Sequence, residues 1–356
     1  MRRALVLAAR GRGLTSPNPV VGCVILDASG RAVGEGWHKR AGGAHAEIHA
    51  LAEAGDDARG GTAVVTLEPC DHTGRTGPCT GALIEAGLSR VVYAVADPHP
   101  AARGGADTLA AAGLDVEGGF MAPEAEAVNT AWLTAVRRGR PHVHWKYAAT
   151  LDGRVAAADG SSRWITSPES RADVHRLRAE SDAVLVGSGT LRTDDPHLAV
   201  RGVEGAAQPL RVVADTRATV PPTARVLDAV APTLIAVAEG ADTRHLPDTD
   251  VVRLPPGDQG TGLSLTALLA ELYRRDVRSV LLEGGPTLAG AFAAAGLLDQ
   301  VTGYLAPALL GAGPQVLGDA GITSLARALR LQVTEVVRMG PDVRVTAVAV
   351  TTTEEF

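Results

Sequence analysis

The chain has 356 residues, of which 46% are hydrophobic, 21% charged and 3% aromatic, a balance that excludes a disordered or collagen-like protein and favours two packed domains. The 34 basic and 40 acidic residues give a net charge of −6, and both halves divided near residue 140 are slightly acidic. Because duplex nucleic acid requires a cationic surface, we expect no nucleic-acid partner.

The N-terminus resembles a signal peptide, but Arg10 and Arg12 interrupt its apolar stretch after six residues, so we interpret it as a short amphipathic helix. No apolar run approaches the ~18 residues that a membrane span needs, so no membrane partner is expected. The three cysteines, Cys23, Cys70 and Cys79, are an odd and clustered set that does not fit a disulfide framework. Metal or thiol chemistry in a reducing compartment fits them better, and we expect a cytoplasmic protein.

The first part of the chain alternates strand and helix patterns. Strands are predicted at 20–27, 32–38, 62–67 and 90–97, and helices at 46–54, 80–86 and 104–112. Glycines stop each of these helices, and the alternation is typical of an α/β sandwich. The arginine-rich stretch 137–141, interrupted by Gly139 and Pro141, indicates a boundary between domains 1–140 and 141–356.

The second part repeats the alternation and predicts another α/β domain. Strands are expected at 142–149, 183–187, 210–215, 233–237 and 279–283, and helices at 168–180, 265–275 and 287–295. The chain ends in a predicted hairpin, 331–338 and 343–351, with its turn at 340–342. The segment 238–262 is rich in Gly, Pro and Asp, so we expect an exposed loop there.

A cluster of potential metal ligands lies in the first domain: His45, Cys70 and Cys79. One imidazole and two thiolates suit Zn²⁺ and leave a fourth position for water, whose pKa the metal lowers toward ~7, giving hydroxide at neutral pH. Glu47 is the predicted catalytic proton shuttle. Residues two apart do not share a helix face, so His45 and Glu47 converge only if they open the helix, which the preceding glycines 42–43 allow.

Other interpretations explain these residues less well. A structural zinc closed by His72 would be inert and would give Glu47 no role. A metalloprotease site with His49 fails, because its glutamate would have to follow His45 directly. Cys23, in a strand that looks buried, is more typical of a small core residue than of a ligand.

His-x-Glu followed by Pro-Cys is the signature of zinc-dependent nucleobase deaminases, although eight residues separate the cysteines here instead of two. This spacing resembles the deaminase half of the bifunctional riboflavin biosynthesis proteins of the RibD family. The supporting motifs are 17–25, 36–42, 45–47, 66–70, 74–76 and 97–100, with Gly77 and His99 as small departures. The resemblance covers nearly the whole chain and implies a cytidine-deaminase-like α/β/α sandwich followed by a dihydrofolate-reductase-like α/β domain.

The resemblance implies two successive reactions. The first is zinc-hydroxide deamination of 2,5-diamino-6-(5-phosphoribosylamino)pyrimidin-4(3H)-one, and the second is NADPH reduction of the ribosyl group of 5-amino-6-(5-phosphoribosylamino)uracil to ribityl. It also implies that Asn18 and His38 line the base and ribose end of the first site. Chemistry alone suggests Arg75 with Thr76 for the phosphate, although an ordinary surface arginine would explain Arg75 nearly as well.

Two glycine-rich loops, 186–190 and 283–290, follow predicted strands in the second domain and would let backbone amides approach an anion. A standard Gly-x-Gly-x-x-Gly fingerprint is absent. The motifs 146–154, 164–167, 175–178, 193–196 and 283–286 resemble the reductase half of the family. That resemblance implies NADPH binding by Ala148, Trp164, Thr190, Asp194, Thr216, Gly285, Pro286, Thr287, Leu288, Ala289, Gly290 and Ala291.

The same resemblance implies substrate binding in the reductase half. The residues concerned are Ser162, Arg178, Leu198, Arg201 and Glu283. The two arginines would clamp the ribose phosphate, although without the family match surface ion pairs would explain them better. Lys146 and Asp152 are the candidate proton donors, although a structural role would explain Lys146 equally well.

Two further hypotheses remain for the whole protein. A nucleic-acid deaminase would need base-stacking aromatics and a basic groove, for which the near-neutral first domain offers little. A zinc-stabilised binding module without catalysis would have no use for Glu47. The resemblance also indicates a homo-oligomer, a dimer or tetramer, and leaves open that one half is catalytically silent.

Overall fold

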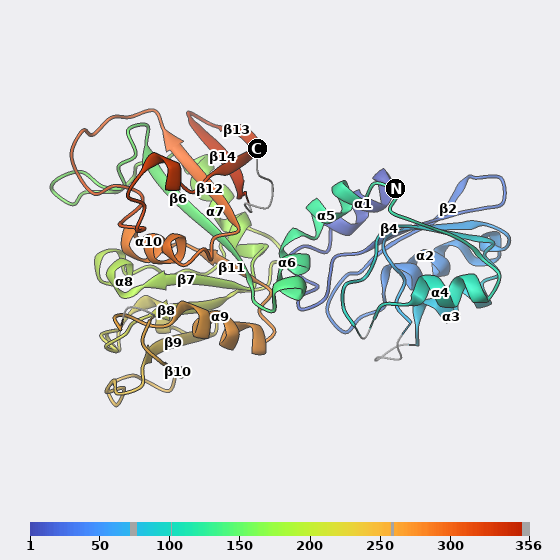
Figure 1. Ribbon diagram of the computed structural model, residues 1–356, viewed down its shortest axis with the longest axis horizontal. Helices are drawn as coiled ribbons and strands as arrows, with labels where there is room; N and C mark the ends of the chain where they lie inside the picture. Colours follow the sequence, from blue (N-terminus) through green and yellow to red (C-terminus); the bar gives the residue numbers. More distant parts are fainter. Residues whose placement is uncertain (72–76, 101, 258–259, 351–356) are drawn as a thin grey trace. The chain divides into compact units, whose positions relative to one another are not determined.

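A computed structural model of the protein describes residues 1–71, 77–100, 102–257 and 260–350. The chain divides into two compact units, Met1–Arg140 and Pro141–Phe356 (Figure 1). Within the described ranges, no helix has the length and apolar character needed to cross a membrane.

The first unit is built on one sheet with the strand order β2-β1-β3-β4-β5. Strand β1 runs antiparallel to β2 and β3, whereas β3, β4 and β5 are parallel. In chain order the elements are α1 (Arg2–Ala9), β1 (Gly22–Leu26), β2 (Ala32–Trp37), α2 (Ala46–Ala54), the 3₁₀ helix η1 (Gly55–Ala58), β3 (Thr62–Leu67), α3 (Cys79–Glu85), β4 (Arg90–Val95), α4 (Gly105–Ala111), β5 (Asp115–Gly118), α5 (Ala122–Val128) and α6 (Thr130–Arg138).

Helices cover both faces of this sheet, because its strands alternate buried side chains between the faces. Cys23 and Ile25 of β1 join the apolar cluster that contains residues of α2, α3 and α4. Val24, between them, packs against α1 on the other face, where residues of α5 and α6 also gather. Cys23 is therefore a core residue, as its strand context suggested, and the unit is a three-layered α/β/α sandwich.

Glycines in β2 allow α2 to lie very close to the sheet. A Cβ atom at Gly36 would lie 2.2 Å from the carbonyl oxygen of Ala46 and 2.5 Å from the backbone nitrogen of Ala50. At Gly34, a Cβ would lie 2.1 Å from the Ala50 carbonyl oxygen. These contacts fix the first turns of α2 against β2, and with them the residues at the N-terminus of the helix.

The second unit contains a nine-stranded sheet of order β10-β9-β8-β7-β11-β6-β12-β14-β13. The strands from β10 to β12 in this order pair in parallel, whereas β14 pairs antiparallel with both β12 and β13. The elements are β6 (His142–Thr150), α7 (Pro168–Ala179), β7 (Ala183–Gly187), α8 (Ser188–Asp194), β8 (Leu210–Ala214), η2 (Arg225–Leu227), β9 (Thr233–Ala238), β10 (Asp250–Leu254), α9 (Leu265–Arg274), β11 (Ser279–Leu282), α10 (Pro286–Ala294), β12 (Gln300–Ala306), η3 (Leu325–Arg327), β13 (Leu331–Met339) and β14 (Asp342–Ala349).

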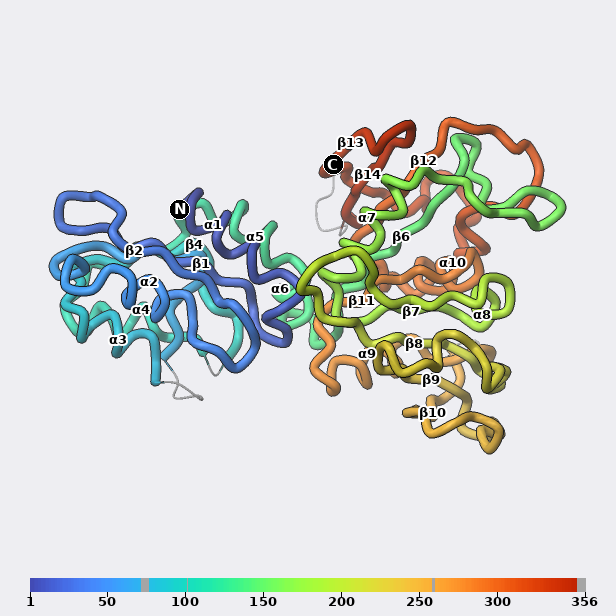
Figure 2. The backbone as a smooth tube through the Cα atoms, turned by 180° about the vertical axis from the view of Figure 1, so that it is seen from behind, coloured from blue at the N-terminus to red at the C-terminus, as the bar shows by residue number. Residues whose placement is uncertain are grey.

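The central strands of this sheet are apolar on both faces, as parallel strands covered by helices must be. Leu185 of β7 faces a cluster with residues of α9 and α10, and its neighbours Val184 and Val186 face a cluster with residues of α7 and α8. Figure 2 shows β10 and the β13–β14 hairpin at opposite ends of the sheet. Because the strands from β10 to β12 are parallel, their carboxyl ends lie together at one end of the strands, where ligands of open α/β sheets usually bind.

The sequence patterns anticipated most of these elements, including the N-terminal helix and the final hairpin. The expectation of an unbroken exposed loop over 238–262 is wrong, since β10 lies inside it and pairs with β9. Several elements were not anticipated by any pattern: α5, α6, α8, β5 and β12.

Candidate functional site

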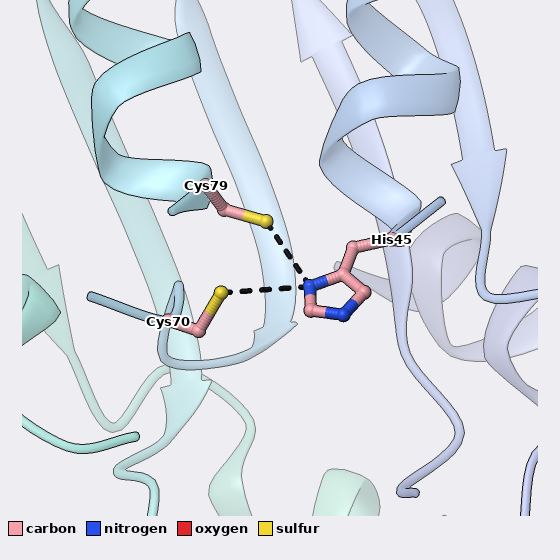
Figure 3. Close-up of side chains that lie close together, drawn as sticks. All are labelled: His45, Cys70 and Cys79. Atoms are coloured by element: carbon pink, nitrogen blue, oxygen red, sulfur yellow. Dashed lines mark hydrogen bonds between the residues drawn. The ribbon is translucent and has the colours of Figure 1, made fainter. Parts of the chain in front are cut away.

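Three potential metal ligands converge in the first unit (Figure 3). The Nδ1 atom of His45 lies 3.3 Å from the Sγ atom of Cys79 and 3.5 Å from that of Cys70. One ligand atom from each residue lies within 4.8 Å of the other two, and no other such group of His, Cys, Asp or Glu occurs in the described residues. An imidazole nitrogen and two sulfur atoms form a donor set that Zn²⁺ prefers.

The local backbone explains how distant residues reach one point. His45 has an extended backbone and is the N-cap of α2, so it lies just outside the helix, while Glu47 lies in the first turn. Cys79 is the first residue of α3, and Cys70 follows β3 in a loop. The prediction that His45 and Glu47 open a helix is therefore confirmed. His72, Arg75 and Thr76 lie outside the described residues.

His45, Cys70, Cys79 and Glu47 form an electrostatic cluster in which all but the half-buried His45 are buried. The Glu47 side chain is buried, and this burial raises the pKa of its carboxyl group. The pKa of Cys70 lies well below that of a free thiol, because the Cys79 thiol and His45 both form hydrogen bonds with it, whereas the pKa of Cys79 is raised. The hydrogen bond with Cys70 also raises the pKa of His45. Of the two sulfur atoms, that of Cys70 is therefore the one on which negative charge is favoured.

The structure brings Asn18 and His38 to this cluster. The His38 ring is 3% exposed and lies edge-on to the His45 ring, with 5.4 Å between their centroids. Its Nδ1 atom lies 3.1 Å from the carbonyl oxygen of Ala44, and its Nε2 atom lies 3.4 Å from the Asn18 amide nitrogen. Nδ1–H therefore donates to the carbonyl and Nε2 accepts from Asn18. Burial lowers the pKa of His38, which favours this neutral ring.

Glu68 lies beside the site, and no role was predicted for it from the sequence. Its carboxylate accepts hydrogen bonds from the backbone N–H groups of Asp97, Gly104 and Ala106, at 3.0, 3.1 and 3.0 Å. It thereby anchors the segment between β4 and α4 beside Cys70. A glutamate at the end of an apolar strand was the available signal, but its three partners lie about 30 or more positions further along the chain.

In the second unit, three of the singled-out residues form one buried ion cluster. Arg178 donates from Nε and Nη2 to the Glu283 carboxylate at 2.6 and 3.0 Å, and Lys146 Nζ lies 3.4 Å from it. The Glu283 side chain is 7% exposed. Burial raises the pKa of Glu283, but the adjacent Arg178 and Lys146 charges outweigh this and hold it at about 2. The cluster therefore keeps one net positive charge.

Arg201 extends this positive region. Its side chain is exposed, and its backbone N–H donates to Nδ1 of His175, which lies on α7 together with Arg178. Arg178 also donates to the carbonyl oxygen of Ala199 at 3.2 Å, beside the chain segment that carries Leu198. The Leu198 side chain itself is fully buried in the apolar cluster below α7, so only its backbone faces this region.

The two candidate proton donors differ in their surroundings. Asp152 accepts a hydrogen bond from the Thr150 hydroxyl at 2.6 Å and from the backbone N–H groups of Leu310 and Gly311. These bonds lower the pKa of Asp152 to about 2, so it is ionised at neutral pH and serves to hold the 310–311 segment. Lys146 instead lies in the ion cluster, 3.4 Å from the Glu283 carboxylate.

The glycine-rich loops meet at the carboxyl edge of the sheet. The Gly285 N–H donates to the Thr190 hydroxyl at 3.0 Å, which joins the starts of α10 and α8. Within 285–291, Ala289 is packed into the core and Gly290 lies against the backbone of Asp319, whereas Thr287 is exposed. The other expected cofactor residues include Ala148 on β6, Thr216 after β8, and Leu288, whose side chain lies against Gly284.

Arg163, next to Trp164 in the chain, connects the segment that carries Trp164 with Asp194. The Trp164 side chain is 69% exposed, with the Arg171 guanidinium 4.5 Å from its ring centroid. The neighbouring Arg163 donates to the carbonyl oxygen of Asp194 at 2.8 Å. Ser162 belongs to the same segment, which precedes α7. An exposed indole over a partly polar surface is available for stacking against a planar ligand.

Comparisons with known proteins find a matching family for each of the two units. The model of the RibD C-terminal domain matches residues 141–345, and that of the cytidine and deoxycytidylate deaminase zinc-binding region matches residues 1–95. The riboflavin biosynthesis protein RibD of Escherichia coli (strain K12) is 45% identical over 96% of both chains. That of Mycobacterium tuberculosis (strain CDC 1551 / Oshkosh) is 47% identical over 95% of this chain and 93% of its own.

Solved structures show the same arrangement of elements. A diaminohydroxyphosphoribosylaminopyrimidine deaminase/5-amino-6-(5-phosphoribosylamino)uracil reductase from Thermotoga maritima superimposes with a TM-score of 0.89 at 34% identity, covering 98% of this chain and 97% of its own. Acinetobacter baumannii RibD, form 1, gives a TM-score of 0.89 at 38% identity, with 98% of both chains covered.

A deaminase-type metal-binding unit followed by a reductase-type unit defines a bifunctional enzyme, with one hydrolytic and one redox activity. The chain belongs to the RibD family of riboflavin biosynthesis proteins, which combine these deaminase and reductase activities. The predicted family and the predicted fold class, a cytidine-deaminase-like unit followed by a dihydrofolate-reductase-like unit, are both confirmed.

Proposed function

We propose that domain 1–140 deaminates 2,5-diamino-6-(5-phosphoribosylamino)pyrimidin-4(3H)-one and that domain 141–356 reduces the ribosyl group of the product to ribityl with NADPH. The convergence of His45, Cys70 and Cys79 beside the buried Glu47 carries this proposal. The solved relative from Thermotoga maritima, named for the same pair of reactions, supports the choice of substrates.

His45, Cys70 and Cys79 would hold Zn²⁺, because an imidazole nitrogen and two sulfur atoms, all within 4.8 Å of one another, are the donors that this ion prefers. Bound zinc supplies Lewis acidity, which lowers the pKa of water toward ~7. Glu47 takes the proton of the attacking water and delivers it to the amino group that leaves as ammonia. His38, whose ring lies against that of His45, and its partner Asn18 hold the base and ribose end of the substrate.

The start of α10 and the start of α8 would hold the pyrophosphate of NADPH. Gly285 and Thr190 already join these helix starts, and a Cβ atom added at Gly189 would meet no atom within 4 Å, which leaves backbone amides open to an anion. The bound cofactor supplies hydride. The remaining residues proposed for its binding are Ala148, Trp164, Asp194, Thr216, Pro286, Thr287, Leu288, Ala289, Gly290 and Ala291.

The positive region of the second unit would bind the phosphorylated substrate. Arg201, exposed and outside the Glu283 ion cluster, offers the charge that a phosphate requires, and Arg178 stands beside it. Ser162, Glu283 and the backbone at Leu198 complete the proposed substrate residues. Lys146 is the proposed proton donor, since Asp152 is ionised.

We also propose a homo-oligomer in a reducing, cytoplasmic setting. Strand β13 forms one edge of its sheet, and its Leu331, Val333 and Val336 side chains are 40%, 57% and 63% exposed. Such an edge favours pairing with another chain. The three cysteines are free, as ligand thiols must be. Light scattering on purified protein tests this assembly, and a monomer at micromolar concentration would exclude it.

The proposed function is tested with the full chain, the diaminopyrimidine phosphate and NADPH in one reaction. Ammonia should appear first, and NADPH absorbance should fall only as deaminated product accumulates; added directly, that product should support immediate oxidation. Ammonia from cytidine-containing oligonucleotides, but none from the pyrimidine phosphate, would favour a nucleic-acid deaminase. Neither reaction in a zinc-loaded sample would support the non-catalytic alternative.

A further inference from the structure

The residue that follows each cysteine ligand makes a contact that the reaction chemistry does not use. Asp71 follows Cys70, and Thr80 follows Cys79. The Thr80 hydroxyl donates to Oδ1 of Asp71 at 2.6 Å, and the Thr80 N–H donates to the Cys70 carbonyl oxygen at 3.3 Å. A side-chain bond and a backbone bond therefore join the two ligand segments directly beside the sulfur atoms.

The two partners differ in burial. Thr80 is 1% exposed, and its hydroxyl group donates to the Asp71 carboxylate. Asp71 lies at the surface, where its other oxygen accepts a hydrogen bond from the Thr108 hydroxyl of α4 at 2.7 Å. The Asp71–Thr80 bond thus joins a surface carboxylate to a buried hydroxyl and is partly shielded from water.

The long connection between the two cysteines makes this bond important for metal binding. In a Cys-x-x-Cys motif the short connection alone keeps two thiolates together, whereas eight residues separate Cys70 from Cys79 here. A longer connection leaves more conformational freedom to be lost when both sulfur atoms bind one ion. A contact that holds the segments together before binding removes part of that cost.

We propose that Asp71 and Thr80 are positioning residues that fix Cys70 and Cys79 at the spacing of one Zn²⁺ ion and thereby raise the affinity for the metal. The proposal rests on the proposed zinc site and adds to it residues that touch neither metal nor substrate. Partners outside the ligand set typically alter metal affinity about 10- to 100-fold. Because Asp71 is exposed, we expect the lower end of that range.

The test compares zinc dissociation constants of full-length variants by competition with a chromophoric chelator. Thr80→Val and Asp71→Ala should each bind zinc about tenfold more weakly than the wild type. The double variant should be no weaker than Thr80→Val alone, because both changes remove the same bond. Thr80→Ser, which keeps the hydroxyl, should restore most of the affinity. Thr108→Val is the matched control: it removes the other hydroxyl partner of Asp71 and should change the affinity little.

Thermal unfolding of the metal-free variants separates positioning from a loss of fold, since a positioning role requires that affinity falls more than apo stability explains. Wild-type affinity in both Asp71→Ala and Thr80→Val would overturn the proposal, as would an equal loss in Thr108→Val or additive losses in the double variant. If the wild type itself bound no zinc, the proposed zinc site would fail as well. Normal wild-type binding with unaffected variants would overturn only the positioning role.

Discussion

At the scale of single residues, we expect the replacement of Glu47 to have the largest effect on the rate of deamination. It lies in the first turn of α2, is 3% exposed and is not one of the three proposed metal ligands. Replacing its carboxylate by an amide should therefore leave the metal site formed. We expect Glu47→Gln to slow ammonia release about 10²- to 10⁴-fold, the usual contribution of a positioned proton carrier. Steady-state deamination and zinc content, measured on one preparation, check this.

The reductase reaction of Glu47→Gln serves as its internal control and should keep the wild-type rate. A variant that deaminates at the wild-type rate would remove Glu47 from the mechanism. A variant without zinc would show that the carboxylate supports the ion rather than the proton transfer.

Glu283 links the second site to stability. Its pKa of about 2 lies below the 4.5 of a free glutamate, so the ionised form stabilises the folded unit by about 3 kcal/mol above pH 4.5. This contribution is lost as the pH falls from 4.5 toward 2. Glu283→Gln, which leaves Arg178 and Lys146 without a counter-charge, should lower the free energy of unfolding by a similar amount at pH 7.

Denaturant unfolding of both proteins over a range of pH checks the sign. The difference between wild type and Glu283→Gln should shrink as the solution becomes more acidic than pH 4.5. A difference that stayed constant, or grew, would show that the ionised carboxylate does not stabilise the fold.

At the scale of elements, the close contact of α2 with β2 positions the first metal ligand. Gly36→Ala places a Cβ atom against the backbone of Ala46 and must push the start of α2 outward, and His45 with it. We expect a loss of about 1–3 kcal/mol in the free energy of unfolding and weaker zinc binding. Gly81→Ala in α3 is the matched control, since its Cβ would meet only Pro78 at 3.8 Å.

Chemical denaturation and zinc titration of the two glycine variants decide the point. Gly81→Ala should be as stable as the wild type or slightly more stable, because alanine favours a helix interior. If Gly36→Ala matched it in both measurements, the close approach would not be what holds α2 in place.

The sequence predicted the elements that have strong local signals. The apolar runs of β1, β3 and β4 and the glycine that ends α2 are examples. It did not predict β10, because that five-residue strand sits among Gly, Pro and Asp residues and pairs only with β9. The helices α5 and α6 follow one another through Asn129, with neither Gly nor Pro to mark the break.

The metal ligands could be predicted because their residue types and spacing are specific to one chemistry. The roles of Asp152 and Glu68 could not, since they depend on partners that only the fold supplies. Asp152 holds backbone groups 158 and 159 positions away, and Glu68 holds a segment after the next strand. Neither partner set leaves a trace in the local sequence.

At the scale of the whole molecule, we expect that the deaminase and reductase activities can be lost independently. Arg201→Ala removes an exposed guanidinium while leaving the backbone hydrogen bond to His175 intact. We expect the reductase KM for the phosphorylated substrate to rise about ten- to hundredfold, as for the loss of a charged hydrogen bond, with kcat for deamination unchanged. Arg244→Ala, an exposed arginine paired with Asp242, is the control and should alter neither reaction.

Kinetics of both reactions with each variant provide the check. An equal loss of deamination and reduction in Arg201→Ala would mean that the two activities share a site or a conformational step. An unchanged reductase KM would remove Arg201 from phosphate binding.

The most direct measurement is zinc content and ammonia release on the same samples of wild type and His45→Ala. The wild type should hold one zinc ion per chain and release ammonia from the diaminopyrimidine phosphate. His45→Ala should lose both, while still oxidising NADPH with the deaminated substrate. A His45→Ala protein that kept its zinc and still released ammonia would contradict the account.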